Sequence, residues 1–426
     1  MSNKQTKPLM PKLRFPDFLA AEGWRVVPLS QLARRTKKKN RDQKITRVLT
    51  NSAEFGVVDQ RDFFDKDIAI QGNLESYFIV EIGSYVYNPR ISTTAPVGPI
   101  SKNKIETGVM SPLYTVFKFE NDSNEFYEHY FKTTGWHTYI RQASSTGARH
   151  DRMAISSDDF MAMPLPVSSP AEQQKIADCL SSLDELIAAQ ARKFDALKTH
   201  KKGLMQQLFP REGETQPRLR FAEFRDAGEW EETTLGAYFD PIRNGFVGTA
   251  TPYYTTSEGV RYLQGRNIKQ GMIDADNLIF ITNDFHNRQR KSHLKTGDIL
   301  MVQSGHVGEC AVVGPDFDGA NCHALVILTP RKKLSSEFFG QYFYAPIGKL
   351  AIFQITTGNT IKHILASELK TLPIHVPSLA EQQRIADCLT ALNTLITTAS
   401  QELEILKTHK KGLMQKLFPP PEVVEA

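Results

Sequence analysis

The chain has 426 residues, too many for one ordinary hydrophobic core, so we expect two or more domains. Its net charge of +5 is mildly basic, and it has no run of 18 or more apolar residues. The N-terminus lacks the apolar core of a secretory signal, and the four cysteines form no CxxC pair. We therefore expect a cytoplasmic protein with free thiols, no membrane span and no zinc ribbon.

Residues 1–168 form the first expected domain. The segment Leu13-Arg14-Phe15-Pro16-Asp17-Phe18 leads to Trp24 and is followed by a basic run over 34–41. That run fits a solvated loop or a phosphate-contacting segment equally well. Short apolar runs at 77–80, 83–90 and 114–117 predict strands. Loop 144–152 combines hydroxyl groups, glycine and cations, which suits phosphate contact but also an ordinary turn.

Residues 169–210 predict one long helix. Apolar residues recur at alternating spacings of three and four, which is the pattern of a coiled-coil seam. Ser169 and Glu172 have the spacing of a capping box, and Pro210 ends the pattern. At roughly 1.5 Å per residue such a helix is roughly 55 Å long.

Residues 211–377 form the second expected domain. A related segment, Leu219-Arg220-Phe221-Ala222-Glu223-Phe224, again leads to a tryptophan, Trp230. A strand is predicted at 298–302, and a loop with glycine and histidine follows at 356–363. The two domains resemble each other only weakly, and both read as mixed α/β.

The long helix then recurs over 378–419, before a tail at 420–426. Residues 172–210 and 381–419 are identical at 24 of 39 positions, which indicates a tandem duplication. Each helix must bury its apolar stripe, so we expect the two to pack antiparallel, with a pseudo-twofold axis relating the domains. The end of the second helix should then lie near the first Leu-Arg-Phe segment. The Lys-Thr-His-Lys-Lys run shared by both copies either complements the helix dipole or docks another protein.

The sequence lacks the common catalytic motifs. It contains no Gly-x4-Gly-Lys loop, no His-Glu-x-x-His and no Gly-x-Ser-x-Gly elbow. Asn88-Pro89-Arg90 is not the Asn-Pro-Pro-aromatic signature with which an amino-methyltransferase holds a flipped base. Two unlike domains on one repeated scaffold therefore predict paired readers and no active site or metal site in this chain.

These features together resemble the specificity subunits of type I restriction-modification systems. The resemblance covers the whole chain and rests on the two Glu-Gln-Gln-Lys/Arg-Ile-Ala helix starts, the preceding 163–166 and 372–374, the strand at 85–90 and Gly-Asp-Ile-Leu from Gly297. Two departures stand out: Ser84 replaces the aspartate found at Asp298, and Gln303 stands where many relatives carry arginine.

The resemblance implies a non-catalytic subunit that reads double-stranded DNA. Each domain would read one half of a bipartite, asymmetric site, and the helices would fix the spacer between the halves. The helices would bind two modification subunits, which carry S-adenosylmethionine, and restriction subunits that use ATP and Mg would join them. The partner-binding candidates are the helix starts: Glu172, Gln173, Gln174, Glu381, Gln382 and Gln383.

The DNA-contact candidates are cations, amides and hydroxyl groups in loops, together with one tyrosine. They are Lys37, Lys38, Lys39, Tyr87, Asn88, Arg90, Arg149, His150 and Arg152 in the first domain, and Arg261, Gln264, Arg266, Gln303, Ser304, His306, Lys362 and His363 in the second.

Two other readings stay open at this point. The chain could be a specificity factor for a different phage-defence methyltransferase. It could also be a coiled-coil scaffold whose domains bind protein or a small ligand; failure to bind any duplex would favour that scaffold.

Overall fold

The computed structural model describes residues 8–63, 74–121, 125–146, 151–331, 333–358 and 362–419. The chain divides into two compact units. Unit 1 comprises Met1–Gln190 and Glu402–Ala426, and unit 2 comprises Ala191–Gln401. The division cuts both long helices near their middle, so each unit contains the start of one helix and the end of the other. No helix in the described ranges is long and apolar enough to cross a membrane.

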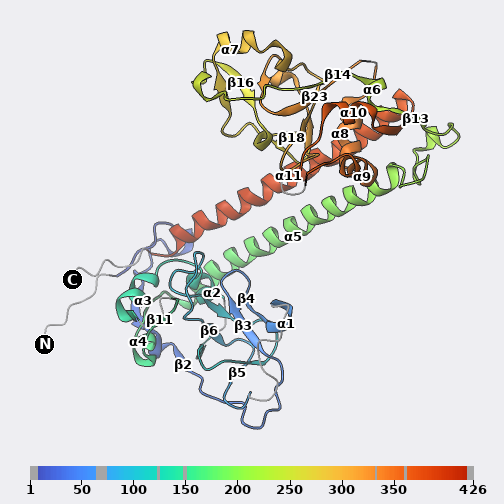
Figure 1. Ribbon diagram of the computed structural model, residues 1–426. Helices are drawn as coiled ribbons and strands as arrows, with labels where there is room; N and C mark the ends of the chain where they lie inside the picture. The colour runs from blue at the N-terminus through green and yellow to red at the C-terminus, as the bar shows by residue number, and fades with distance from the viewer. Residues whose placement is uncertain are drawn as a thin grey trace. The chain divides into compact units, whose positions relative to one another are not determined.

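The two long helices are α5 (Pro170–Leu208) and α11 (Leu379–Leu417), and both stand out in Figure 1. The side-chain oxygens of Ser169 and Ser378 accept from the backbone N–H groups of Glu172 and Glu381, at 3.3 and 3.4 Å. The serine half of each expected capping box is therefore confirmed. The glutamate half is wrong, because both carboxylates bond to arginines.

The rest of unit 1 is a mixed α/β domain. Its main sheet is antiparallel with strand order β2-β9-β6-β7, and β1 pairs separately with β12 just before α5. Further pairs are β3-β4, β5-β8 and β10-β11. The element bounds are β1 (Arg25–Pro28), β2 (Ala33–Arg35), β3 (Leu49–Ser52), β4 (Gly56–Asp59), α1 (Gln60–Phe63), β5 (Phe78–Val80), β6 (Tyr85–Tyr87), β7 (Ile100–Lys102), β8 (Gly108–Met110), β9 (Thr115–Phe119), α2 (Phe126–Phe131), α3 (His137–Ala143), β10 (Ser145–Thr146), β11 (Met153–Ala154), α4 (Ser157–Met161) and β12 (Pro164–Val167).

Unit 2 contains a second mixed α/β domain. Its main sheet has order β14-β23-β20-β21, which corresponds strand for strand to that of unit 1, and β13 pairs with β24 before α11. A second sheet, β15-β19-β16-β22, includes the parallel pair β16-β22, and β17 pairs with β18. The element bounds are β13 (Glu231–Thr234), α6 (Leu235–Tyr238), β14 (Phe239–Asn244), β15 (Tyr254–Thr255), β16 (Val260–Leu263), β17 (Ile268–Lys269), β18 (Met272–Ile273), β19 (Ile279–Ile281), α7 (Asn283–Arg288), β20 (Ile299–Val302), β21 (Cys310–Val312), β22 (Asn321–Cys322), β23 (Leu325–Pro330), α8 (Ser336–Tyr344), α9 (Pro346–Gln354), α10 (Ala366–Thr371) and β24 (Pro373–Val376).

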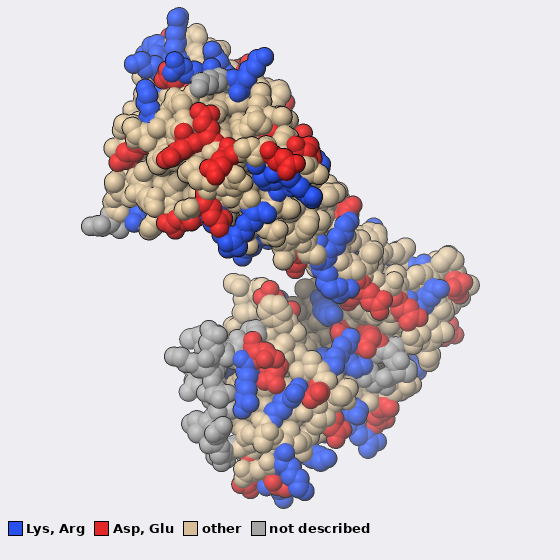
Figure 2. All heavy atoms as spheres, turned by 90° about the vertical axis from the view of Figure 1, so that its right-hand side faces the viewer, with Lys and Arg blue, Asp and Glu red and all other residues tan. Residues whose placement is uncertain are grey.

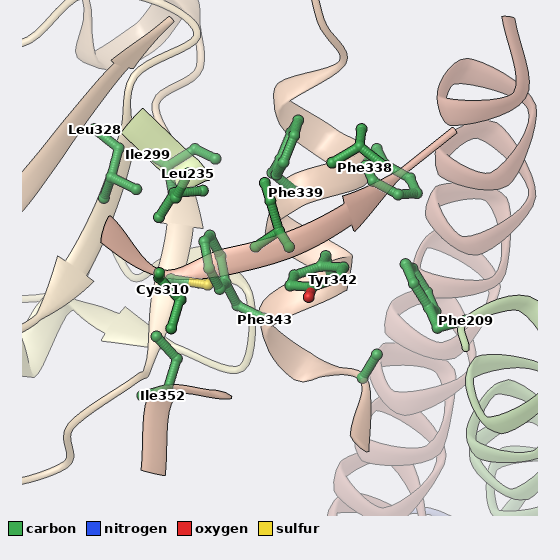
Figure 3. Packing of buried hydrophobic residues seen from close by; sticks show 14 of the residues in the cluster. Phe209, Leu235, Ile299, Cys310, Leu328, Phe338, Phe339, Tyr342, Phe343 and Ile352 are labelled. Atoms are coloured by element: carbon green, nitrogen blue, oxygen red, sulfur yellow. The ribbon is translucent and has the colours of Figure 1, made fainter. Parts of the chain in front are cut away.

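The end of each long helix completes the core of the unit that contains it. In unit 2, Phe209 at the end of α5 packs against Phe338 and Tyr342 of α8, with ring centroids 5.5 and 6.0 Å apart (Figure 3). In unit 1, Phe418 at the end of α11 packs against Trp24 and Phe126. All of these rings are buried, so both cores depend on the end of the long helix that follows the other α/β domain.

Matching backbone bonds accompany this packing. The N–H of Leu13 donates to the carbonyl of Lys416 in unit 1, and the N–H of Leu219 donates to that of Gln207 in unit 2, both at 2.9 Å. The expectation that the second helix ends near the first Leu-Arg-Phe segment is thereby confirmed.

Within unit 1 the two helix segments run antiparallel. Asp184 of α5 pairs with Lys410 of α11, and Gln190 donates to Glu402 at 2.7 Å. Partner numbers fall on α11 as they rise on α5, which fixes the direction.

An arginine–glutamate pair clasps each Leu-Arg-Phe segment to a helix start. Arg14 donates two hydrogen bonds to the carboxylate of Glu172, at 2.7 and 2.8 Å, and Arg220 does the same to Glu381, at 2.9 and 2.6 Å. All four side chains are at least 93% buried. The Trp24 indole also donates to Glu172, at 3.0 Å. Such bidentate bonds fix the angle at which the chain meets the helix.

We expect Glu172→Gln to lower the free energy of unfolding of unit 1 by about 3 kcal/mol, because it leaves the buried Arg14 without its counter-charge. Glu381→Gln should act likewise on unit 2. Hydrogen–deuterium exchange with peptide resolution measures both effects, and each loss of protection should stay within one unit. The control is Asp178→Asn, an exposed change on the same helix, which should stay within about 0.5 kcal/mol of wild type. Equal loss of protection in both units after Glu172→Gln would contradict a local clasp.

Candidate nucleic-acid interface

In both units, the loop after an inner strand of the main sheet pairs with a loop from late in the domain. In unit 1, the N–H of Ile91 donates to the carbonyl of Asp151 at 3.0 Å, and the N–H of Met153 donates to that of Pro89 at 2.9 Å. In unit 2, the N–H of Gly305 donates to Lys362 at 3.3 Å, and that of Ile364 donates to Gln303 at 3.0 Å. The same two-bond ladder thus joins residues about 60 apart in sequence, which places candidates from both loops together.

The ladder of unit 1 carries two arginines that share one carboxylate. Arg90 lies 3.6 Å and Arg152 lies 3.8 Å from the same oxygen of Asp151. The Arg90 side chain remains 66% exposed. One negative charge between two guanidinium groups leaves a net positive site with free donors.

A hollow of about 560 Å³ lies beside these arginines. Asn51, Asn88, Arg90, Tyr114 and Arg152 are among its lining residues. The Asn88 side-chain amide donates to the carbonyl of Asn51 at 2.9 Å, which holds the hollow's wall in place. Its polar lining suits the edges of bases or a phosphodiester.

The expected basic run, 34–41, begins within strand β2 and continues beyond it. Lys37, Lys38 and Lys39 are all exposed, and Lys38 lies 3.7 Å from Glu81. Exposed lysines on a loop suit contact with the DNA backbone, which carries no sequence information.

The ladder of unit 2 carries different side chains. Ser304, His306, Lys362 and His363 are exposed there, and Gln303 is half-buried. His306 and Lys362 line a hollow of about 330 Å³, together with apolar groups that include Ile352. Position for position along the ladders, Ser304 and His363 replace Arg90 and Arg152, and Lys362 replaces Asp151.

The remaining candidates of unit 2 lie within β16 or just after it. Arg261 stacks 5.8 Å from the centre of the Phe317 ring, Arg266 donates to the carbonyl of Asn277 at 3.1 Å, and Gln264 donates to the Tyr254 hydroxyl at 3.0 Å. Arg261 and Arg266 remain exposed despite these contacts.

Comparison with known proteins bears on this arrangement. The family described as "Type I restriction modification DNA specificity domain" matches residues 229–407. The putative type I restriction enzyme MjaX specificity subunit of Methanocaldococcus jannaschii is 27% identical over 321 residues, covering 75% of this chain and 68% of the relative. The MjaVIII specificity subunit of the same organism is 27% identical over 293 residues, covering 65% of each. The match therefore spans about two thirds of these relatives.

Solved structures agree on the fold. The type I restriction-modification S subunit from M. genitalium superposes with a TM-score of 0.59 at 14% identity, covering 97% of this chain and all of that one. A chain from a structural study of assembly of the type I system gives a TM-score of 0.53 at 16% identity, covering 97% and 99%.

Residues 229–407 of this chain thus match the type I restriction-modification DNA specificity domain, and the relatives it resembles are type I specificity subunits. Sequence-specific DNA recognition is the function of that family.

One DNA-contact candidate is wrong. Tyr87 is 1% exposed, stacks on Phe160 at 4.8 Å and donates its hydroxyl to the carbonyl of Val97 at 2.9 Å. Burial also raises the pKa of its phenol. Strand β6 is covered on both faces, so Tyr87 belongs to the core. Two other candidates, Arg149 and His150, lie outside the described residues.

The helix-start candidates separate into buried and exposed groups. Glu172, Glu381 and Gln382 are at most 2% exposed, so their side chains offer no surface to a partner. Gln173 is half-buried, whereas Gln174 and Gln383 are exposed. The prediction that Glu172, Glu381 and Gln382 bind a partner is therefore wrong, because these side chains are buried.

Sequence reasoning missed one basic cluster. Arg288, Arg290 and Lys291 are exposed at and just after the end of α7. Figure 2 shows Lys and Arg side chains gathered at the edge of unit 2 where α7 lies. Three cations within four residues of the printed sequence could have revealed it.

Within the described ranges, no group of three or more His, Cys, Asp or Glu side chains could hold a metal ion. The adjacent residues Cys322 and His323 have structural roles. Burial raises the pKa of the Cys322 thiol to about 12, which disfavours a reactive thiolate, and His323 contacts the Tyr262 hydroxyl at 3.2 Å.

We expect Arg90→Ala to weaken DNA binding about tenfold, because one exposed guanidinium contact contributes about 1–3 kcal/mol. Tyr87→Phe should leave affinity unchanged and lower stability by about 1 kcal/mol, the value of its lost hydrogen bond. Fluorescence anisotropy on a target duplex and thermal melting measure the two quantities. A large loss of DNA affinity in Tyr87→Phe with normal folding would show that Tyr87 does contribute to the DNA interface.

Proposed function

We propose that this chain reads a bipartite, asymmetric DNA site, with one half read by each recognition domain. The observation that carries the proposal is the pair of equivalent ladders. Both follow an inner strand, β6 or β20, of sheets with the same strand order, yet Arg90 and Arg152 stand in one, and their counterparts Ser304 and His363 in the other. Two ladders with the same backbone hydrogen bonds but different side-chain donors should recognise different bases.

The side chains divide by role. Arg90 and Arg152 can donate two parallel bonds to a guanine edge, whereas Ser304 and His363 can exchange hydrogen bonds with several bases. The exposed lysines after β2 and the cations after α7 would hold phosphates and set the register of each domain.

The helices would act as the spacer. We propose that α5 and α11 form an antiparallel coiled coil along their full length, relating the recognition domains 1–168 and 211–377 by a pseudo-twofold axis. Helices of roughly 55 Å suit half-sites about one DNA turn apart, roughly 34–36 Å. The antiparallel contacts within unit 1 support this arrangement.

Catalysis would belong to other subunits in the cytoplasm. Two modification subunits would dock on the helices and supply S-adenosylmethionine, and restriction subunits would supply ATP- and Mg-dependent steps. This chain would need no cofactor of its own. The purified chain alone should therefore transfer no methyl group to a duplex.

Replacing residues 230–377 with the matching domain of a relative should change one half-site and leave the other half-site and the spacer unaltered. Methylation-sensitive sequencing of DNA modified by the assembled complex reports the whole motif. The control is replacement of the first domain, which should change the opposite half. A change in both halves after one replacement would contradict independent readers.

Inserting four residues after Gln190 and four after Glu402 should alter the spacer length, or abolish binding, without changing either half-site. The insertion lengthens the helices by roughly 6 Å. The same sequencing measures the outcome, and an altered half-site would show that the helices do more than separate the readers.

A further inference from the structure

Helix α2 of unit 1 and helix α8 of unit 2 occupy equivalent places in their units. Phe126 and Tyr130 of α2 pack on the phenylalanine that follows α11, with ring centroids 5.3 and 5.6 Å apart. Phe338 and Tyr342 of α8 pack on the phenylalanine that follows α5, at 5.5 and 6.0 Å. The remaining residues of the two helices can therefore be compared position by position.

In unit 1, the chain surrounds the carboxylates of α2 with its own lysines. Lys102 of β7 lies 3.6 Å from Glu125, and Lys104 lies 2.7 Å from Glu128. Lys132, just after α2, lies 3.4 Å from Glu128. Three ammonium groups thus accompany two carboxylates at this place.

The equivalent place in unit 2 lacks such cations. The glutamate near the start of the helix recurs as Glu337, whereas Gly340 replaces the second glutamate. Val312 of β21 occupies the position of Lys102, because each pairs with the first residue of the neighbouring inner strand, β20 or β6. Within the described ranges, Glu337 forms no ion pair and accepts one hydrogen bond, from the Ser335 hydroxyl at 3.5 Å. Its carboxylate has no counter-charge there.

A hollow of about 370 Å³ lies beside this part of α8. Glu337, Gly340 and Gln341 of α8 and Val312 of β21 contribute to its lining. Helix α11 contributes Asn393 and four threonines, Thr390, Thr394, Thr397 and Thr398. Among the described lining residues, only Glu337 carries a charge. The hollow is therefore rich in oxygen acceptors around a single carboxylate.

One polar group of this lining lacks a partner. Gln341 is 9% exposed, and its side-chain oxygen is buried without a hydrogen-bond partner among the residues that the structure describes. Its counterpart in unit 1, His129, shares a hydrogen bond of 3.1 Å with Ser181 of α5. A buried acceptor without a donor is rare in folded proteins, because it forfeits its hydrogen bonds to water. A ligand with N–H donors would satisfy this oxygen.

We propose that the hollow binds an alkylammonium group, with the Glu337 carboxylate as its counter-charge and the Gln341 side-chain oxygen as a hydrogen-bond acceptor. An ammonium has three N–H donors and no acceptor, which matches this lining. The ligand supplies the positive charge that lysines of the chain supply in unit 1. Val312 and the threonine methyl groups contact its methylene chain. The inference is independent of the proposed DNA reading, since no ladder residue lines the hollow.

An alkylammonium group can come from a free polyamine or from a lysine side chain of another protein. Isothermal titration calorimetry of the full chain without DNA separates these sources, with spermidine as one probe and Nα-acetyl-lysine methylamide as the other. The probe that binds more tightly identifies the source, and a neutral diol of similar length should not bind. Binding of neither ammonium probe would overturn the proposal.

Two substitutions and a matched control locate the binding. Glu337→Gln should weaken it at least about tenfold, because hydrogen bonds to a charged acceptor are the stronger ones. Val312→Lys should abolish it, because the chain's own ammonium then fills the place, as Lys102 does in unit 1. The control, Glu125→Gln, removes the equivalent carboxylate of unit 1 and should leave the affinity within about twofold.

Thermal melting shows whether each variant folds. Unchanged affinity in folded Glu337→Gln, or an equal loss in Glu125→Gln, would mean that the cation binds elsewhere on the chain and would overturn the proposal.

Discussion

The end of a long helix completes the core of each recognition domain. Phe418 packs on Trp24 and Phe126 in unit 1, and Phe209 packs on Trp230 and Phe338 in unit 2. Each of these phenylalanines contributes about 2 kcal/mol by burial, and the matching backbone bonds to Leu13 and Leu219 align the helix end with its unit. Unit 1 takes its helix end from beyond the second domain, whereas unit 2 is one continuous segment, Ala191–Gln401.

This constraint distinguishes the elements that close each core, which we call the frame, from the ladder loops, which we propose contact DNA. The arginine–glutamate clasps, the aromatic cores and the order of the main sheet repeat in both units, because each is needed to close a core around a helix end. The ladder loops lie outside that requirement. Arg90 and Arg152 can therefore differ from their counterparts Ser304 and His363 without disturbing the frame. Under the proposed function, such a chain can change the DNA bases it reads while its helices remain the same.

The helices illustrate the same division along their length. Their ends are buried in the two cores, as Leu208 and Leu417 show. At their centres, residues 188–196 and 397–405 share no identity.

Periodicity and repetition determined much of this protein from sequence alone. They predicted both long helices to within a residue or two, the strands at β5, β6, β9 and β20, and the return of the second helix to the first Leu-Arg-Phe segment. These features depend on local spacing and on the need to bury a stripe, and both can be read along the chain. Only the tertiary structure decided which side chains are exposed and can contact DNA or a partner. Both faces of β6 are covered, so all three of its residues, Tyr85, Val86 and Tyr87, are buried. The alternation of polar and apolar residues does not predict this. Glu172 and Glu381 became core residues because arginines 158 and 161 positions earlier reached them. The two loops of each ladder also lie together because of long-range packing. Such packing decides which residues are buried and which lie side by side, and the order of residues along the chain does not show it.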